Sequence, residues 1–351
     1  YTTLFRSHYD VRGMNPITDP VSGFVYPASW LEHCSAEDRL LAESGFAVLT
    51  SDGRALKRGF TTGATAAAAV YAACASLGGT AVSSSPVCLA CGIAADIPAS
   101  GTSGIGFARK YSGDYPADIT AGICFKAEAV PADSIRFTAG FGVGRFVRDT
   151  PRYKKGDAAI SPPALRTILS AADAGCRASG ISGAEILLTI PEGERIGKQT
   201  LNPKIGVEGG ISVVGTTGFV EPWDDHLSET MEERISSAEN VVITTGRIGL
   251  RYSRLLFPDH EAILAGSKIA EALSASASCR SVVLCGLPGL ILRYFNPDVA
   301  TNRGFATVEE LIASPAGGPA LHEELNKIRE AFPKTRVCII SREGTVIGDT
   351  A

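Results

Sequence analysis

Hydrophobic and polar positions follow different patterns in the two halves of the chain, and this difference predicts two domains. In the first half, an alanine-rich run at 64–77 that stops at Gly78-Gly79 predicts a helix, and apolar residues three and four apart predict another at 163–174. Few helices beside clustered strands indicate an α+β domain with an antiparallel or mixed sheet. The strands are predicted at 86–94, 104–110, 119–129, 134–139 and 185–190.

From residue 209 onward, short apolar runs alternate with segments of helical periodicity, as expected of an α/β domain with a four-stranded, mainly parallel sheet. The strands are predicted at 211–214, 241–245, 282–285 and 337–340, and the helices at 226–238, 260–278 and 318–331. We therefore expect an N-terminal extension or arm at 1–56, an α+β domain at 57–208 and an α/β domain at 209–351. Residues 1–13 precede Met14 and are expected to be an upstream or non-native extension without a function.

Composition narrows the class of protein. The 351 residues are 45% hydrophobic and 20% charged, which is typical of a globular chain. A net charge of -4 excludes a general positive field for nucleic acid or an anionic membrane, so neither is an expected partner. No apolar run of about 18 residues and no signal-peptide order occurs, so we expect a cytoplasmic protein. Nine scattered cysteines indicate reduced thiols rather than disulfides.

Three glycine-containing loops follow the first three predicted strands of the second half: Gly215–Gly218, Gly246–Gly249 and Gly286–Gly289. Ligands of open α/β sheets bind outside the carboxyl ends of the strands, so the three loops are expected to outline one site. The alternative is that the glycines only close tight turns. Neither a Gly-x-Gly-x-x-Gly fingerprint nor a P-loop is present, so a standard nucleotide fold is not supported.

Two segments of the first half are candidates for binding anions. Gly59-Phe60-Thr61-Thr62-Gly63 stands where the alanine-rich helix begins, and unpaired amides at a helix N-terminus attract anions; simple capping by either threonine is the alternative. Residues 140–155 carry five cations against one anion and suit a ligand with several carboxylates, unless the segment is only a solvated basic loop. The five histidines form no metal or triad pattern, and the Cys88 and Cys91 pair lacks a second pair, so no zinc site is expected.

Several motifs together resemble the cobalt-precorrin-5B C1-methyltransferase family of anaerobic cobalamin biosynthesis. The most specific runs from Gly209 to Pro222 and reads GGISVVGTTGFVEP; the others are RGFTTG at 58–63, GVGR at 142–145 and TLNP at 200–203. The resemblance covers most of 57–295. Departures are Ala64-Thr65 where the family commonly has Thr-Cys, and Ser161 in place of the Asn of an Ala-Ile-Asn-Pro pattern.

This resemblance implies that S-adenosylmethionine (SAM) donates a methyl group to carbon 1 of cobalt-precorrin-5B, giving cobalt-precorrin-6A. The cobalt then arrives inside the small-molecule substrate, and no protein-bound metal is expected. Because the methyl group of a sulfonium is already activated, the reaction needs alignment and exclusion of water rather than a side-chain nucleophile. Rival hypotheses are a nicotinamide-dependent tetrapyrrole reductase and a non-catalytic corrinoid-binding protein. Whether the chain forms a homo-oligomer is left open.

The site residues follow from the motifs and the resemblance together. We predict that the cofactor contacts Gly215, Thr216, Thr217, Gly218, Gly246 and Gly286, with Glu221 or Asp224 near the ribose or sulfonium. The predicted substrate-binding residues are Arg58, Thr61, Thr62, Gly63, Arg145, Arg148 and Arg152. No catalytic residue is assigned; Asp114, Asp118 and Glu208 are weaker candidates for handling a proton.

Overall fold

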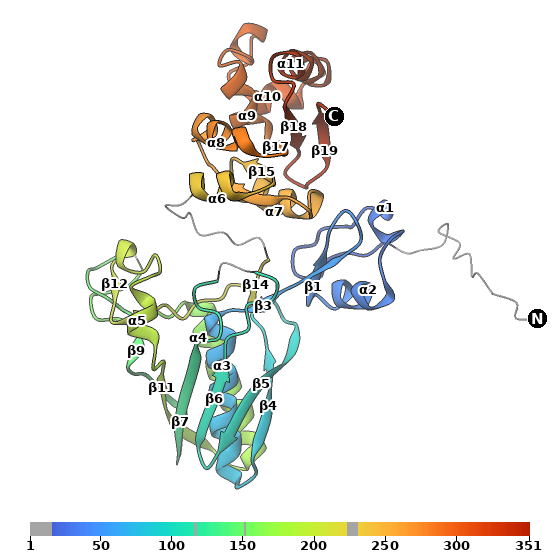
Figure 1. The fold of residues 1–351 in the computed structure, drawn as a ribbon. Helices are drawn as coiled ribbons and strands as arrows, with labels where there is room; N and C mark the ends of the chain where they lie inside the picture. The colour runs from blue at the N-terminus through green and yellow to red at the C-terminus, as the bar shows by residue number, and fades with distance from the viewer. Residues whose placement is uncertain (1–15, 116–117, 151, 223–230) are drawn as a thin grey trace, which may run out of the picture. The chain divides into compact units, whose positions relative to one another are not determined.

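The computed structural model describes residues 16–115, 118–150, 152–222 and 231–351. The chain is a mixed α/β protein with several sheets, and it divides into two compact units. The central unit comprises residues 56–222, and the terminal unit comprises the residues up to 55 together with those from 223 onward (Figure 1). Strand β2 (Ala55–Lys57) leads from one unit into the other.

The central unit is built on a six-stranded sheet in the order β4-β5-β6-β7-β11-β8. Neighbouring strands run antiparallel, except that β8 is parallel to β11. Inward and outward residues alternate along β5 and β6, so only one face of the sheet is buried. The bounds are β4 Val82–Cys88, β5 Ala94–Thr102, β6 Ile105–Arg109, β7 Cys124–Ala132, β8 Arg136–Ala139 and β11 Gly183–Thr189. The single strand predicted at 86–94 is wrong, because the β4–β5 turn interrupts it at residues 89–93.

Two helices, α3 (Thr62–Ala75) and α4 (Pro162–Ser179), cover the buried face of this sheet (Figure 1). Both agree with the sequence prediction. Thirteen of the fourteen residues of α3 are buried, and its alanines let the helix lie very close to the strands. A Cβ placed on Gly106 of β6 would approach the Ala69 carbonyl oxygen of α3 to 2.1 Å. The alanine-rich run is therefore a packing surface as well as a good helix former.

Short two-stranded pairings extend the central unit beyond its main sheet. The strand β13 (Gly210–Ile211) is parallel to β9 (Gly142–Val143), and an isolated bridge joins Val213 to Ile160. The 211–214 strand predicted for the parallel sheet is therefore wrong, and the expected boundary at 208/209 moves to 222. The remaining elements here are β3 Gly59–Phe60, β10 Arg145–Phe146, α5 Gly193–Gly197, η3 Pro203–Ile205, β12 Val207–Glu208 and β14 Phe219–Val220; β14 pairs with β3, and β12 with β10.

The terminal unit contains a five-stranded sheet in the order β16-β15-β17-β18-β19. Four strands are parallel and β19 is antiparallel, which corrects the predicted four-stranded sheet. The strands are β15 Asn240–Thr244, β16 Glu261–Leu264, β17 Ser281–Gly286, β18 Thr335–Ile340 and β19 Val346–Asp349. The helices are α6 Met231–Ser237, α7 Arg247–Leu256, α8 Ile269–Ala275, α9 Pro288–Phe295, α10 Val308–Ala313 and α11 Gly317–Ala331. The first part of the helix predicted at 260–278 is wrong, because β16 occupies residues 261–264 and a turn at Gly266, whose φ is +62°, separates it from α8.

Residues 16–55, expected to form an extension or arm, pack with the C-terminal part of the chain. The Ser51 amide donates to the Leu255 carbonyl at 2.6 Å, and the rings of Phe24 and Tyr252 lie 5.4 Å apart. This segment contains α1 Ala28–Leu31, α2 Ala36–Glu43 and β1 Ala47–Leu49. Among the helices of the described residues, none is long and apolar enough to cross a membrane.

Candidate functional site

The amino end of α3 holds the 209–222 segment in place. The Thr62 hydroxyl accepts a hydrogen bond from the Val214 amide at 2.8 Å and lies 3.0 Å from the Ser212 carbonyl. The Gly63 amide donates to the Val214 carbonyl at 2.9 Å, while the Thr61 hydroxyl caps the Ala64 amide at 3.2 Å. These contacts agree with the alternative that the threonines cap the helix. The Gly63 and Ala64 amides, which could have bound an anion, donate instead to atoms of the chain. The three residues thus act as supports for the 209–222 segment.

The Gly215–Gly218 loop belongs to this support and not to the edge of the parallel sheet. A Cβ on Gly215 would meet the Thr61 hydroxyl at 2.4 Å, and Gly218 has a φ of +95°, which favours glycine. The Thr217 carbonyl accepts from the Cys91 amide at 2.9 Å, whereas the side chain of Thr216 is exposed. The prediction that three glycine loops share one edge is therefore wrong for the first loop.

Arg58 and Glu221 form a buried ion pair directly beside this loop. Their Nε and Oε2 atoms lie 2.9 Å apart, and the side chain of Arg58 has no exposed surface. The guanidinium also lies 5.8 Å from the ring centre of Phe219, which stacks on Phe60. In this arrangement Arg58 anchors the end of the 209–222 segment and presents no face to a ligand. Asp224, the alternative to Glu221, lies outside the described residues.

The three weaker catalytic candidates have separate surroundings. Asp114 accepts from the Lys57 amide at 2.7 Å and thereby links its loop to the end of β2. Glu208 is exposed on β12, opposite Arg145 in the strand pairing. Asp118 forms a buried ion pair with Lys110 and also accepts from Thr120. Burial by itself raises the pKa of Asp118, but Lys110 and Thr120 outweigh burial and lower it below its ordinary value.

This ion pair predicts a loss of stability in acid. Because the folded-state pKa of Asp118 lies below the unfolded value, its contribution is complete above the ordinary value of 3.8 and is lost as the pH falls through the folded pKa. We expect Asp118→Asn to cost about 1.5–3 kcal/mol of unfolding free energy at pH 7 and to flatten the decline in stability as the pH falls below 3.8. Urea unfolding at several pH values measures both effects. An acid decline as steep in the variant as in the wild type would contradict the assignment.

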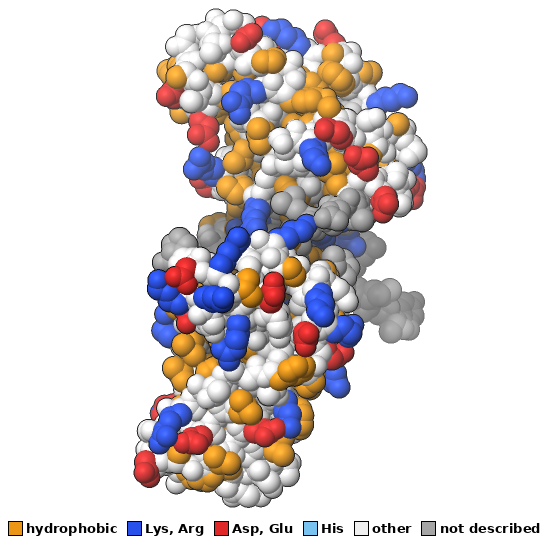
Figure 2. Space-filling model, turned by 90° about the vertical axis from the view of Figure 1, so that its left-hand side faces the viewer, with side chains coloured by type: hydrophobic (Ala, Val, Ile, Leu, Met, Phe, Trp, Pro, Cys, Tyr) orange, Lys and Arg blue, Asp and Glu red, His pale blue; other side chains and the backbone are white. Residues whose placement is uncertain are grey.

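Basic side chains gather around β10, β12 and α5. We call these exposed side chains the basic lobe; Figure 2 looks onto the side of the molecule where these elements lie and shows the gathering. Some of them are neutralised, since Lys154 pairs with Asp149 at 3.2 Å and Arg195 pairs with Glu192 at 2.9 Å. Arg145 donates to the carbonyls of Ala139 and Gly156. The members of the lobe are Arg145, Arg148, Arg152, Lys154, Lys155, Arg195, Lys198 and Lys204.

Arg148 and Arg152 lie on the exposed loop of this lobe, as expected for side chains that meet a carboxylate. The rings of Phe146 and Tyr153, on the two sides of this loop, stack at 4.4 Å. Asp149 accepts from the Lys155 amide at 2.9 Å. The described residues of the lobe therefore form a cationic surface of the central unit.

A cavity of about 640 Å³ opens at the carboxyl ends of β15 and β17 in the terminal unit. These parallel neighbours lead into α7 and α9, so the cavity lies where α/β sheets place ligands. Of the two predicted cofactor residues near this edge, Gly246 lines the cavity and Gly286 does not. Gly286 is instead buried at the end of β17, where a Cβ would meet the Thr245 hydroxyl at 2.8 Å.

The walls of this cavity combine apolar and charged groups. Ile248, Leu287, Leu290 and Val308 supply an apolar surface, and the ionisable residues are Arg247, Arg293 and Glu309. Sequence reasoning missed the ionisable residues, although Arg247 stands directly after the predicted Gly246. Such a volume and mixture are typical of sites for a small ligand with both apolar and charged parts.

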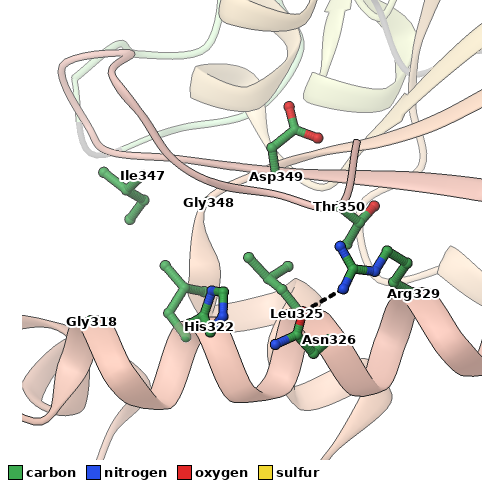
Figure 3. Close-up of a pocket in the computed structure, with 10 residues that line it drawn as sticks. Gly318, His322, Leu325, Asn326, Arg329, Ile347, Gly348, Asp349 and Thr350 are labelled. Carbon is green, nitrogen blue, oxygen red and sulfur yellow. Dashed lines mark hydrogen bonds between the residues drawn. The ribbon is translucent and has the colours of Figure 1, made fainter.

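A second, smaller cavity lies between α11 and β19 and has a volume of about 270 Å³ (Figure 3). Several of its polar side chains already have partners: Arg329 donates to Asn326 at 2.8 Å. Asp349 accepts from Arg336 at 2.8 Å. We assign this cavity no ligand. Within the described residues no cluster of metal-ligating side chains was found.

The family of the chain follows from comparison with known proteins. The CbiD family model matches residues 49–222. A relative from Methanoregula boonei is 52% identical over 334 residues, covering 95% of this chain and 99% of its own. The chain belongs to the CbiD family. The relative from Methanospirillum hungatei is 48% identical over the same shares of the two chains. Both relatives are named cobalt-precorrin-5B C(1)-methyltransferase.

A solved CbiD structure supports the same grouping. The 1.9 Å crystal structure of the cobalamin biosynthesis protein CbiD from Archaeoglobus fulgidus is 33% identical. It superposes with a TM-score of 0.54 and covers 82% of this chain and 98% of its own. The matched family region ends at residue 222, which is also where the central unit ends. The resemblance drawn from the motifs is therefore confirmed.

Proposed function

We propose that this CbiD protein transfers a methyl group from SAM to carbon 1 of cobalt-precorrin-5B in cobalamin biosynthesis, yielding cobalt-precorrin-6A. The observation that carries the proposal is the identity of about half of all residues, over nearly the full length, with relatives of that name. The motifs of the 209–222 segment, which lie within the matched region, agree with it. The protein is accordingly a C-methyltransferase that acts on a small tetrapyrrole.

The proposed methyl transfer needs no side-chain nucleophile. When bound, SAM supplies a methyl group that is already activated as a sulfonium. The residues of the chain then have to hold the two reactants in line and exclude water, which are contributions of binding and geometry. No general base is proposed, because Asp118 is paired with Lys110 and Asp114 accepts from the Lys57 amide.

We propose that the basic lobe binds the acetate and propionate carboxylates of the macrocycle. The exposed guanidinium groups of Arg148 and Arg152 suit such carboxylates, which accept paired hydrogen bonds from arginine. Arg145 stands at the base of the same loop and orients it through the Ala139 and Gly156 carbonyls. The cofactor is assigned to the cavity beside Gly246 in the terminal unit, because its volume and mixed lining suit a nucleoside.

Charge reversal tests the role of the basic lobe. We expect the double variant Arg148→Glu/Arg152→Glu to raise the dissociation constant of the tetrapyrrole by about a hundredfold, roughly tenfold for each lost charged contact, and to leave SAM affinity unchanged. Titration of the corrinoid under anaerobic conditions measures the effect. Arg177→Glu is a matched control, because Arg177 is an exposed arginine of α4 in the same unit, paired with Asp173. Equal corrinoid affinity in the double variant and the control would refute the substrate surface.

The proposed reaction is tested directly by anaerobic incubation with cobalt-precorrin-5B and methyl-labelled SAM, with the product read by mass spectrometry. Gain of one labelled methyl group by the macrocycle supports the proposal. Reduction of the macrocycle by NADPH without methyl gain would favour a nicotinamide-dependent reductase. Tight corrinoid binding without any turnover would favour a non-catalytic binding protein.

A further inference from the structure

The cavity at the carboxyl ends of β15 and β17 has an excess of positive charge at one side. Among the described residues, Arg247 has no ion-pair partner, and the Arg293 side chain donates only to the Gly289 carbonyl of its own helix at 3.2 Å. The acidic residue of the lining, Glu309, is already engaged by Arg342 at 2.8 Å. The cavity therefore holds two cationic side chains without a carboxylate of the described chain to balance them.

Two helices begin at the same cavity, and their amino ends add to its positive electrostatic potential. α7 starts after Gly246 and α9 after Leu287, and neither has a side-chain cap at its first residue. Uncapped first-turn amides and the helix dipole both favour a negative group. A Cβ on Gly246 or Gly289 would meet no atom within 4 Å, so both backbones face open space.

One hydroxyl that lines the cavity has no partner either. Thr245 lines the cavity with only 8% of its surface exposed, and within the described part of the chain its hydroxyl makes no hydrogen bond. A hydroxyl that opens into a cavity and makes no bond within the protein is available to a ligand atom or to water, because it can both donate and accept. This observation is independent of the arginines and the helix ends.

We infer that this end of the cavity binds the carboxylate of the methionyl part of SAM, through Arg247, Arg293 and the first turns of α7 and α9. The inference rests on the proposed function and goes further by naming the residues and the ligand group that they recognise. The apolar walls formed by Ile248, Leu287 and Val308 are left for the adenine ring.

Decarboxylated SAM tests the inference, because it differs from SAM by the group in question. We expect Arg247→Gln and Arg293→Gln each to raise the dissociation constant of SAM about tenfold in calorimetry of the full chain. The same substitutions should change the affinity for decarboxylated SAM by less than about twofold. The wild-type protein should bind SAM more tightly than the decarboxylated compound. Equal wild-type affinity for the two compounds, or no effect of either substitution, would overturn the inference.

Gly289→Asp separates binding from folding. An aspartate in the first turn of α9 stabilises the helix through its dipole, so Tm should stay the same or rise. The same carboxylate occupies the proposed anion position, so SAM affinity should fall about tenfold or more. Arg280→Gln is the control, since Arg280 precedes β17 at its other end and pairs with Glu239 at 3.2 Å. Retained SAM affinity in Gly289→Asp would contradict the inference.

Failure of the inference can be told apart from failure of the proposed function. Methyl transfer by the wild type, together with unchanged SAM binding in the arginine variants, would contradict the proposed carboxylate site but not the proposed reaction. Arginine-dependent SAM binding without methyl transfer would contradict the proposed reaction but not the proposed carboxylate site. Tighter, arginine-dependent binding of NADPH than of SAM would show that the anion is a phosphate and would overturn the inference.

Discussion

Replacing Arg58 by methionine is expected to destabilise the central unit by about 3–5 kcal/mol, because the change leaves the Glu221 carboxylate poorly compensated in a mostly buried position. The substitution also removes the cation beside Phe219, so β14 loses part of its packing. We expect the 209–222 segment to loosen from the amino end of α3. Hydrogen exchange of peptides from residues 56–222 measures the free energy of unfolding of this unit.

An exposed arginine of the same unit provides the control. Arg136 pairs with Glu185 across β8 and β11 while 67% of its side-chain surface remains exposed. Arg136→Met should therefore cost less than about 1 kcal/mol. If Arg58→Met proves no more damaging than Arg136→Met, the buried pair does not anchor the 209–222 segment. Corrinoid titration of the same proteins then shows whether loosening this segment also weakens the substrate site.

Gly106→Ala is expected to cost about 3 kcal/mol, at the upper end of the range for overpacking. The added methyl group would approach the Ala69 carbonyl oxygen to 2.1 Å and the Ala73 amide nitrogen to 2.5 Å. Both atoms belong to the backbone of α3, which cannot move aside without separating from the sheet. Hydrogen exchange of the β6 and α3 peptides measures the loss.

The same substitution at Gly318 should have the opposite sign. Gly318 lies in the first turn of α11, and an added methyl group there would meet no atom within 4 Å. Alanine at this position should stabilise the terminal unit by about 0.5–1 kcal/mol, since it removes the entropic cost of glycine in a helix. Tolerance at Gly106 would contradict the close packing of α3 on β6, and destabilisation at Gly318 would contradict the open space around that glycine.

The glycine loops after β15 and β17 lie at one edge of the parallel sheet, whereas the first predicted loop does not, and this difference has a physical reason. The loops after β15 and β17 meet at one edge because parallel neighbours end on the same side, and this follows from pattern alone. Residues 211–214 have the same apolar appearance, yet their backbone groups pair with Val143, Ile160 and Thr62. Nothing local in a short apolar run identifies such distant partners.

The sequence by itself determined the family, the helices α3 and α4, the alternation of strands and helices near the C-terminus, and the basic segment around Arg148. Motif identity, helical periodicity and charge are local properties, so they can be read along the chain. Only the tertiary structure decided that Arg58 is buried against Glu221, that Thr62 supports the 209–222 segment, and that Arg247 and Arg293 line one cavity. Those outcomes depend on contacts between residues far apart in the chain, and burial decides whether a charged side chain anchors the fold or remains available to a ligand.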